Sequence, residues 1–149
     1  MDRSFTVKSE NGLLSSLGLP LRVSRAFNPK DGVPDCPRIA FDAMWDTGAT
    51  KSVITQRVVD ALGLKPIRSG FTHGVNGLGA SKAYLVNLYL PDGISMAEWT
   101  VIGTNPGDVW WDVLIGMDII STGDFSVRNV NGKTEWSFSY CSASKVDAT

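Results

Sequence analysis

Short runs of alternating apolar and polar residues, separated by turn residues, recur along the whole chain and predict a mainly β structure. Strands are expected at residues 5–8, 21–27, 38–45, 83–90, 96–102, 113–115, 125–130 and 133–140. In the last of these, Trp136, Phe138 and Tyr140 alternate with serines. One face of that strand is therefore aromatic, and it should either line the core or join a partner subunit.

Two segments have a different period. Apolar positions between residues 53 and 62 recur at helical spacing, which predicts a helix of about two to three turns. Thr50 or Ser52 can cap its start, and Gly63 can end it. A single helical turn is expected at residues 117–121. The dipeptide Asn131-Gly132 favours a type I′ turn between the last two strands.

The chain has 149 residues with 15 glycines and 7 prolines, which suits one domain (1–149) built from many turns. Residues 141–149 look like a disordered tail. The 14 basic residues are scattered and the net charge is −1, which argues against a nucleic-acid or anionic-membrane partner. Partners should be peptides or proteins.

Metal and membrane signals are weak. The chain has two cysteines far apart and one histidine, so zinc has little to bind, and neither a metal nor a cofactor is expected. Residues 1–9 carry charge where a signal peptide needs an apolar core, and no apolar run reaches the roughly 18 residues of a membrane span. A soluble, cytoplasmic protein is expected.

The strongest chemical signal is the stretch from Asp46 to Thr50, Asp-Thr-Gly-Ala-Thr, where an apolar run delivers an acid to a tight turn. Thr47 offers a hydroxyl that can lock one turn to another, and Gly48 lets the backbone turn sharply and approach a ligand. A second apolar run ending in glycine, residues 113–116, could pack behind this turn. Asp46 is the candidate catalytic acid.

Hydrolysing a peptide bond without a metal or a covalent nucleophile needs one group that accepts a proton from water and another that donates one. Two carboxyls sharing one proton do both. At about 3 Å separation and an effective dielectric near 20, two carboxylates repel by roughly 5 kcal/mol, so one of them stays protonated. Because the chain carries a single Asp-Thr-Gly, the second carboxyl must come from another copy related by a two-fold axis.

These motifs resemble the retropepsin-like aspartic proteases. The resemblance covers about residues 40–127 and includes the second motif with Leu114, Ile115 and Gly116 as a structural support. It implies a small closed β-barrel with one helix after the active-site turn and a short helix in the C-terminal third. It also implies that Asp46 is catalytic, that Thr47 holds two active-site loops together across a dimer axis, and that the main chain at Gly48 and Ala49 binds substrate.

Retroviral members often carry an acid and an arginine where this chain has Lys51 and Met117, so it looks more like the cellular or bacterial relatives. The implied activity is that of a homodimeric aspartic endopeptidase, in which water is activated between two Asp46 carboxyls.

A glycine-rich stretch, residues 70–81, is expected to form a flap that closes over a peptide, with a floppy surface hairpin as the alternative. The expected substrate-binding residues at its tip are Val75, Asn76, Gly77 and Leu78. Ala80 stands where a phosphate-binding loop needs lysine, which argues against nucleotide binding.

Several alternatives remain open at this level. The Asp-Thr-Gly could be an ordinary Asx-turn. The domain could be a non-catalytic dimeric peptide-binding or scaffold domain of the same fold, or a processing domain cut from a longer polyprotein. Trp110 and Trp111 could form a substrate wall or pack on the core or a dimer interface.

Overall fold

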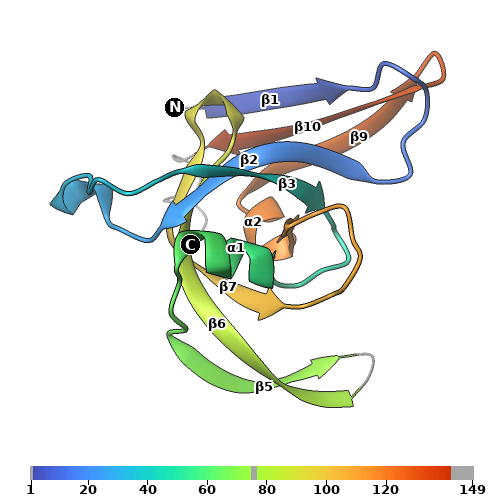
Figure 1. Ribbon diagram of the computed structural model, residues 1–149. Coiled ribbons are helices and arrows are strands. Elements are labelled where there is room, and N and C mark those ends of the chain that lie inside the picture. Colours follow the sequence, from blue (N-terminus) through green and yellow to red (C-terminus); the bar gives the residue numbers. More distant parts are fainter. Residues whose placement is uncertain (1, 75–76, 142–149) are drawn as a thin grey trace, which may run out of the picture.

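The computed structural model describes residues 2–74 and 77–141, and it is mainly β, as the sequence predicts (Figure 1). The strands are β1 (Asp2–Lys8), β2 (Leu17–Arg25), β3 (Ile39–Trp45), β4 (Val53–Thr55), β5 (Arg68–Gly74), β6 (Gly77–Tyr89), β7 (Ser95–Thr104), β8 (Val113–Ile115), β9 (Gly123–Val130) and β10 (Lys133–Cys141). The helices are α1 (Gln56–Leu62) and α2 (Met117–Ile120), with 3₁₀ turns η1 (Pro29–Asp31) and η2 (Pro91–Gly93). The predicted tail lies almost entirely outside the described residues.

Six strands close into a barrel in the order β2-β3-β8-β4-β7-β6. The ring closes because β2 pairs with β3 along most of its length and with β6 from Arg22 to Arg25. Most of these pairs are antiparallel, but β8 runs parallel to β3 and β4 runs parallel to β7. The parallel pair β3–β8 brings the two sequence motifs to the same end of the barrel.

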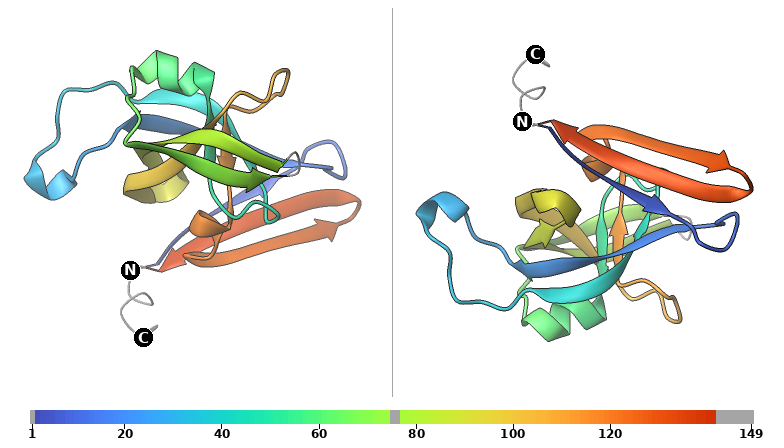
Figure 2. Two further views of the ribbon diagram at one scale, coloured as in Figure 1. Left: turned by 90° about the horizontal axis from the view of Figure 1, so that it is seen from below. Right: turned by 90° about the horizontal axis from the view of Figure 1, so that it is seen from above.

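A separate three-stranded sheet, in the order β1-β10-β9, lies against this barrel (Figure 2). Phe5, Phe125 and Phe138 are on one face of it and contact Trp45 of β3, with ring centroids 5.1–5.8 Å apart. Trp136 and Phe138 are fully buried, so the aromatic face of the last strand lines the core. Burying each such side chain contributes about 1.5–3 kcal/mol, which joins sheet and barrel into one core.

The helix after the motif is shorter than the sequence predicts. Residues 53–55 form β4, because this β-branched run pairs with both β7 and β8, and the helix begins only at Gln56. Thr55 is the N-cap, so the prediction of Thr50 or Ser52 at the cap is wrong. Gly63 does end α1 in the left-handed conformation.

One further strand boundary differs from the prediction, whereas two predicted turns agree with the structure. Pro20 lies inside β2 rather than before it, which is possible because β2 has β3 alone as its neighbour at that position. The turn at Asn131 and Gly132 has positive φ at both residues, as a type I′ turn requires. α2 confirms the predicted helical turn.

The glycine-rich segment forms the hairpin β5–β6, which projects from the barrel at the lower end of Figure 1. Its register pairs Gly74 with Gly77 and His73 with Leu78. Val75 and Asn76, at the predicted flap tip, lie outside the described residues. Among the described residues, no helix is both long enough and apolar enough to cross a membrane.

Candidate active site

Asp46 is the first residue after β3, and its position is fixed by the neighbouring strand. Trp45 is paired with Ile115 of β8, and the Asp46 backbone N–H donates to the Ile115 carbonyl at 2.9 Å. Asp46 is therefore held by a backbone hydrogen bond at the end of β3 and does not lie on an unsupported loop. The side chain is half-buried.

The turn after Asp46 is closed by its own hydrogen bonds. The Gly48 N–H donates to Asp46 Oδ1 at 2.8 Å, and the Ala49 N–H donates to the Asp46 carbonyl at 3.1 Å. The Asx-turn is therefore present, but it uses one carboxylate oxygen, and the described residues give Oδ2 no partner. A carboxylate held by one oxygen leaves the other available for proton transfer.

Gly48 suits this turn for a reason that differs from the expected one. Its φ is not positive, but a Cβ would lie 3.2 Å from Asp46 Oδ1, the oxygen that its N–H binds. A side chain would crowd the carboxylate. The absence of a side chain at Gly48 therefore leaves the Asp46 carboxylate accessible.

The second motif packs directly behind the first. The Met117 N–H donates to the Ala49 carbonyl at 2.7 Å, and the Asp118 N–H donates to the Thr50 carbonyl at 3.2 Å. Gly116 is buried between them, and a Cβ there would lie 2.8 Å from the Ala49 and Lys51 carbonyl oxygens. The predicted packing of residues 113–116 behind the acid is confirmed.

A buried polar network behind the turn was not foreseen from the sequence. The hydroxyl of Ser52, which is fully buried, accepts from the Gly116 N–H at 3.0 Å and donates to Asp118 Oδ1 at 2.8 Å. The indole N–H of Trp99 donates to Asp118 Oδ2 at 3.0 Å. β7 and the two motifs are thereby tied together. The sequence did contain a signal for this network, because polar residues stand beside apolar runs at positions 52 and 118.

The side-chain carboxylate of Asp112 fixes the start of β8 through hydrogen bonds. Asp112 Oδ1 accepts from the Thr55 hydroxyl at 2.8 Å and from Arg57 Nε at 2.6 Å. The Thr55 N–H donates to the Asp112 carbonyl at 3.0 Å. β4, α1 and β8 are therefore fixed relative to each other at the barrel wall.

Asp46 and Thr47 line a hollow of about 370 Å³. Its other walls come from the segment before and within β2, from β3, and from Phe125 and Val127 of β9. The Thr47 hydroxyl has no hydrogen-bond partner among the described residues and is exposed. The Gly48 carbonyl likewise receives no donor there, whereas the Ala49 N–H is used within the turn and the Ala49 carbonyl accepts from the Met117 N–H of the second motif.

The two adjacent tryptophans do not lie in the core. Trp110 is 50 % exposed and covers Gly18 of β2, where a Cβ would lie 2.6 Å from its ring. Trp111 is half-buried. The substrate wall remains a prediction.

Comparison with known proteins agrees with this geometry. Residues 38–132 match the family model described as aspartyl protease. A retropepsin-like aspartic protease from Rickettsia conorii superimposes with a TM-score of 0.53 at 13% identity, covering 94% of this chain and 96% of that one.

Weaker structural matches include the EIAV protease complexed with the inhibitor HBY-793, with a TM-score of 0.44 at 20% identity, covering 55% of this chain and 75% of that one. The simian foamy virus (mac) protease matches with a TM-score of 0.43 at 18% identity, covering 69% of this chain and 92% of that one. A search of curated protein sequences finds no match.

Proposed function

The chain belongs to the aspartyl protease family and has the retropepsin-like fold, and on this premise we propose that it is a homodimeric aspartic endopeptidase. The observation that carries the proposal is the Asp46 turn, hydrogen-bonded to the second motif and with one carboxylate oxygen free. The substrate would be a peptide or protein.

In the proposed reaction a water molecule lies between two Asp46 side chains, one from each subunit. The ionised carboxylate accepts a proton from the water while the oxygen of the water attacks the peptide carbonyl carbon. The protonated carboxyl donates its proton to the carbonyl oxygen, and the tetrahedral intermediate then breaks its C–N bond as the nitrogen is protonated. No metal or covalent nucleophile takes part in these steps.

The main-chain groups around the acid have complementary roles in this proposal. The Gly48 carbonyl, which has no donor among the described residues, would accept from a substrate N–H. The hairpin β5–β6, including Gly77 and Leu78, would close as a flap over an extended peptide and exclude water. The Thr47 hydroxyl would bond to the opposite turn across the axis.

The three-stranded sheet offers a place for the second subunit. β9 pairs with β10 on one side only, whereas the opposite edge strand, β1, is partly covered because the Ser4 N–H donates to the Asp92 carboxylate. Val127 on β9 is 48 % exposed and lines the same hollow as Asp46. An unpaired, partly apolar edge is a template for another strand.

We therefore place the two-fold axis beside β9. Antiparallel pairing of β9 with its copy about Ser126 would set Asp124 opposite the partner subunit's Arg128, and the reverse, so the edge is self-complementary in charge. The same axis would bring the two Asp46 turns toward each other.

The catalytic proposal is tested with Asp46→Asn. The amide oxygen of asparagine can still accept from the Gly48 N–H, so the turn and the fold should survive while cleavage of a fluorogenic peptide library disappears. Asp31→Asn, an exposed acid in η1, is the matched control and should cleave normally. Cleavage that persists in Asp46→Asn, or that a statine-type peptide does not inhibit, would refute the assignment.

The dimer is tested with Asp124→Arg, which would place arginines opposite each other across the axis. Asp2→Arg makes the same reversal on β1, at the far edge of the same sheet. Sedimentation equilibrium should show weaker dimerisation for Asp124→Arg alone. The peptide-cleavage assay should likewise show lower activity for that variant alone. A wild-type protein that stays monomeric at concentrations where it cleaves peptides would exclude the shared site, and equal effects of both variants would exclude the β9 axis.

Two points remain predictions. One is the cytoplasmic location, and the other is catalysis itself. A non-catalytic scaffold domain of the same fold is the alternative, and intact dimers without any cleavage would favour it.

A further inference from the structure

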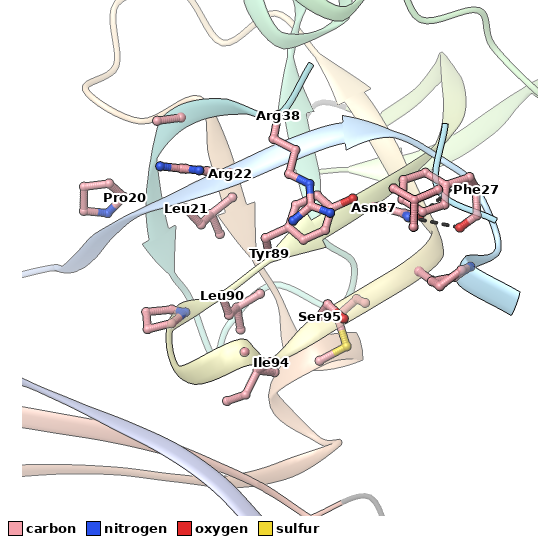
Figure 3. A pocket seen from close by; sticks show the side chains of 17 residues that line it. Pro20, Leu21, Arg22, Phe27, Arg38, Asn87, Tyr89, Leu90, Ile94 and Ser95 are labelled. Carbon is pink, nitrogen blue, oxygen red and sulfur yellow. Dashed lines mark hydrogen bonds between the residues drawn. The ribbon is translucent and has the colours of Figure 1, made fainter. Parts of the chain in front are cut away.

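A large hollow of the described structure lies away from Asp46. It measures about 620 Å³ and is enclosed by β2, β3, β6 and β7 together with the segment between β2 and β3 (Figure 3). Arg38 and Ala40, at the start of β3, line it, whereas Asp46 follows the other end of that strand. The two hollows share no lining residue, so this one is separate from the candidate active site.

One wall of the hollow carries an exposed arginine that stacks on an aromatic ring. The Arg38 guanidinium lies over the ring of Tyr89, 4.0 Å from its centroid (Figure 3). The Tyr89 hydroxyl is itself 2.8 Å from the hydroxyl of Ser24, which is fully buried and donates to a backbone carbonyl. Stacking by its face leaves the in-plane N–H donors of a guanidinium free for a planar anion.

A second arginine lies on the neighbouring strand. Arg22 of β2 is paired in register with Tyr89 of β6, and its side chain is exposed. Neither Arg22 nor Arg38 forms an ion pair or a hydrogen bond to a carboxylate within residues 2–74 and 77–141. The whole chain has a net charge of −1. These two arginines therefore make the hollow more positive than the chain as a whole.

The remaining walls are apolar and partly preformed. Val33 is 67 % exposed at the rim, and Ile94 and Met96 are buried. Phe27 is fixed because the buried Asn87 side chain accepts from its N–H at 3.3 Å and donates to its carbonyl at 3.0 Å. A volume of this size with a few convergent polar groups is typical of ligand sites.

We propose that this hollow is a second binding site, which takes a protein segment that places two carboxylates beside bulky apolar side chains. The carboxylates pair with Arg38 and Arg22, and the apolar side chains contact Phe27, Val33 and Met96. Arginines recognise acidic motifs in this way because the guanidinium fork matches a carboxylate. Binding requires neither cleavage nor a second subunit, so this site stands apart from the proposed catalysis.

The test uses the full chain with Asp46→Asn, so that the probe is not cut. The probe is a fluorescein-labelled peptide of alternating glutamate, leucine and phenylalanine, and binding is followed by fluorescence anisotropy. Arg38→Gln and Arg22→Gln should each weaken binding by about tenfold, because each removes a charge-assisted hydrogen-bonding partner. Lys133→Gln, which removes an exposed charge at the start of β10, should change binding less than about twofold.

Two further measurements separate this site from the Asp46 cleft. A peptide with glutamine in place of glutamate should lose affinity for the parent protein but show no further loss in the arginine variants. Amide chemical shifts should change at Ala40, Tyr89 and Ser95. Shift changes confined to the Asp46 turn, equal binding by the arginine variants, or no binding of the acidic peptide at millimolar concentration would each overturn the proposal.

Discussion

Ser52→Ala tests whether the buried hydroxyl holds the second motif behind the catalytic turn. The substitution removes the acceptor of the Gly116 N–H and the donor to Asp118 Oδ1, and both bonds lie where the hydroxyl is fully buried. Leaving a buried N–H without an acceptor costs about 1–3 kcal/mol. The lost bond to the half-buried Asp118 adds about 1 kcal/mol after discounting for solvent.

Together these losses predict a destabilisation of roughly 3 kcal/mol, or a fall in Tm of about 6–12 °C for a chain of this length. Urea denaturation followed by tryptophan fluorescence measures the free energy of unfolding. Ser9→Ala is the matched control, since its hydroxyl accepts only from the Asn11 N–H at the surface. It should cost less than about 0.5 kcal/mol.

A double-mutant cycle with Asp118→Ala isolates the bond between the two side chains. The double variant should be more stable than the sum of the single losses by about 1 kcal/mol, because the interaction can be lost only once. Equal destabilisation by Ser52→Ala and Ser9→Ala, or strictly additive losses in the cycle, would refute the view that this network supports the site.

Two other predictions concern the site itself. Gly116→Ala places a methyl group 2.8 Å from two backbone carbonyl oxygens, which cannot rotate away, so we expect a loss of about 2–4 kcal/mol of stability; an unchanged denaturation midpoint would show that the loop has room. The proposed sharing of one proton between two carboxyls predicts a bell-shaped dependence of kcat/KM on pH; a rate that rises steadily into the alkaline range would contradict that sharing.

Much of the fold could be predicted from the sequence because the alternation of apolar residues is local information. β8 at Val113–Ile115 and the helical turn after Gly116 were predicted with their observed boundaries to within one residue. The start of α1 was wrong because residues 53–55 fit both a helical spacing and a β-branched strand. Pairing with β7 and β8 decided between the two.

The sequence by itself pointed to Asp46, since an apolar run delivers this acid to an Asp-Thr-Gly turn and a second apolar run ending in Gly116 follows later in the chain. Only the tertiary structure showed that Ser52, Trp99 and Asp118 meet behind that turn, because residues far apart in the chain become neighbours through barrel closure. Likewise, Arg22 and Arg38 read as scattered surface charges in the sequence. They line one hollow because β2 and β3 are paired, and a pairing of that kind depends on the whole sheet.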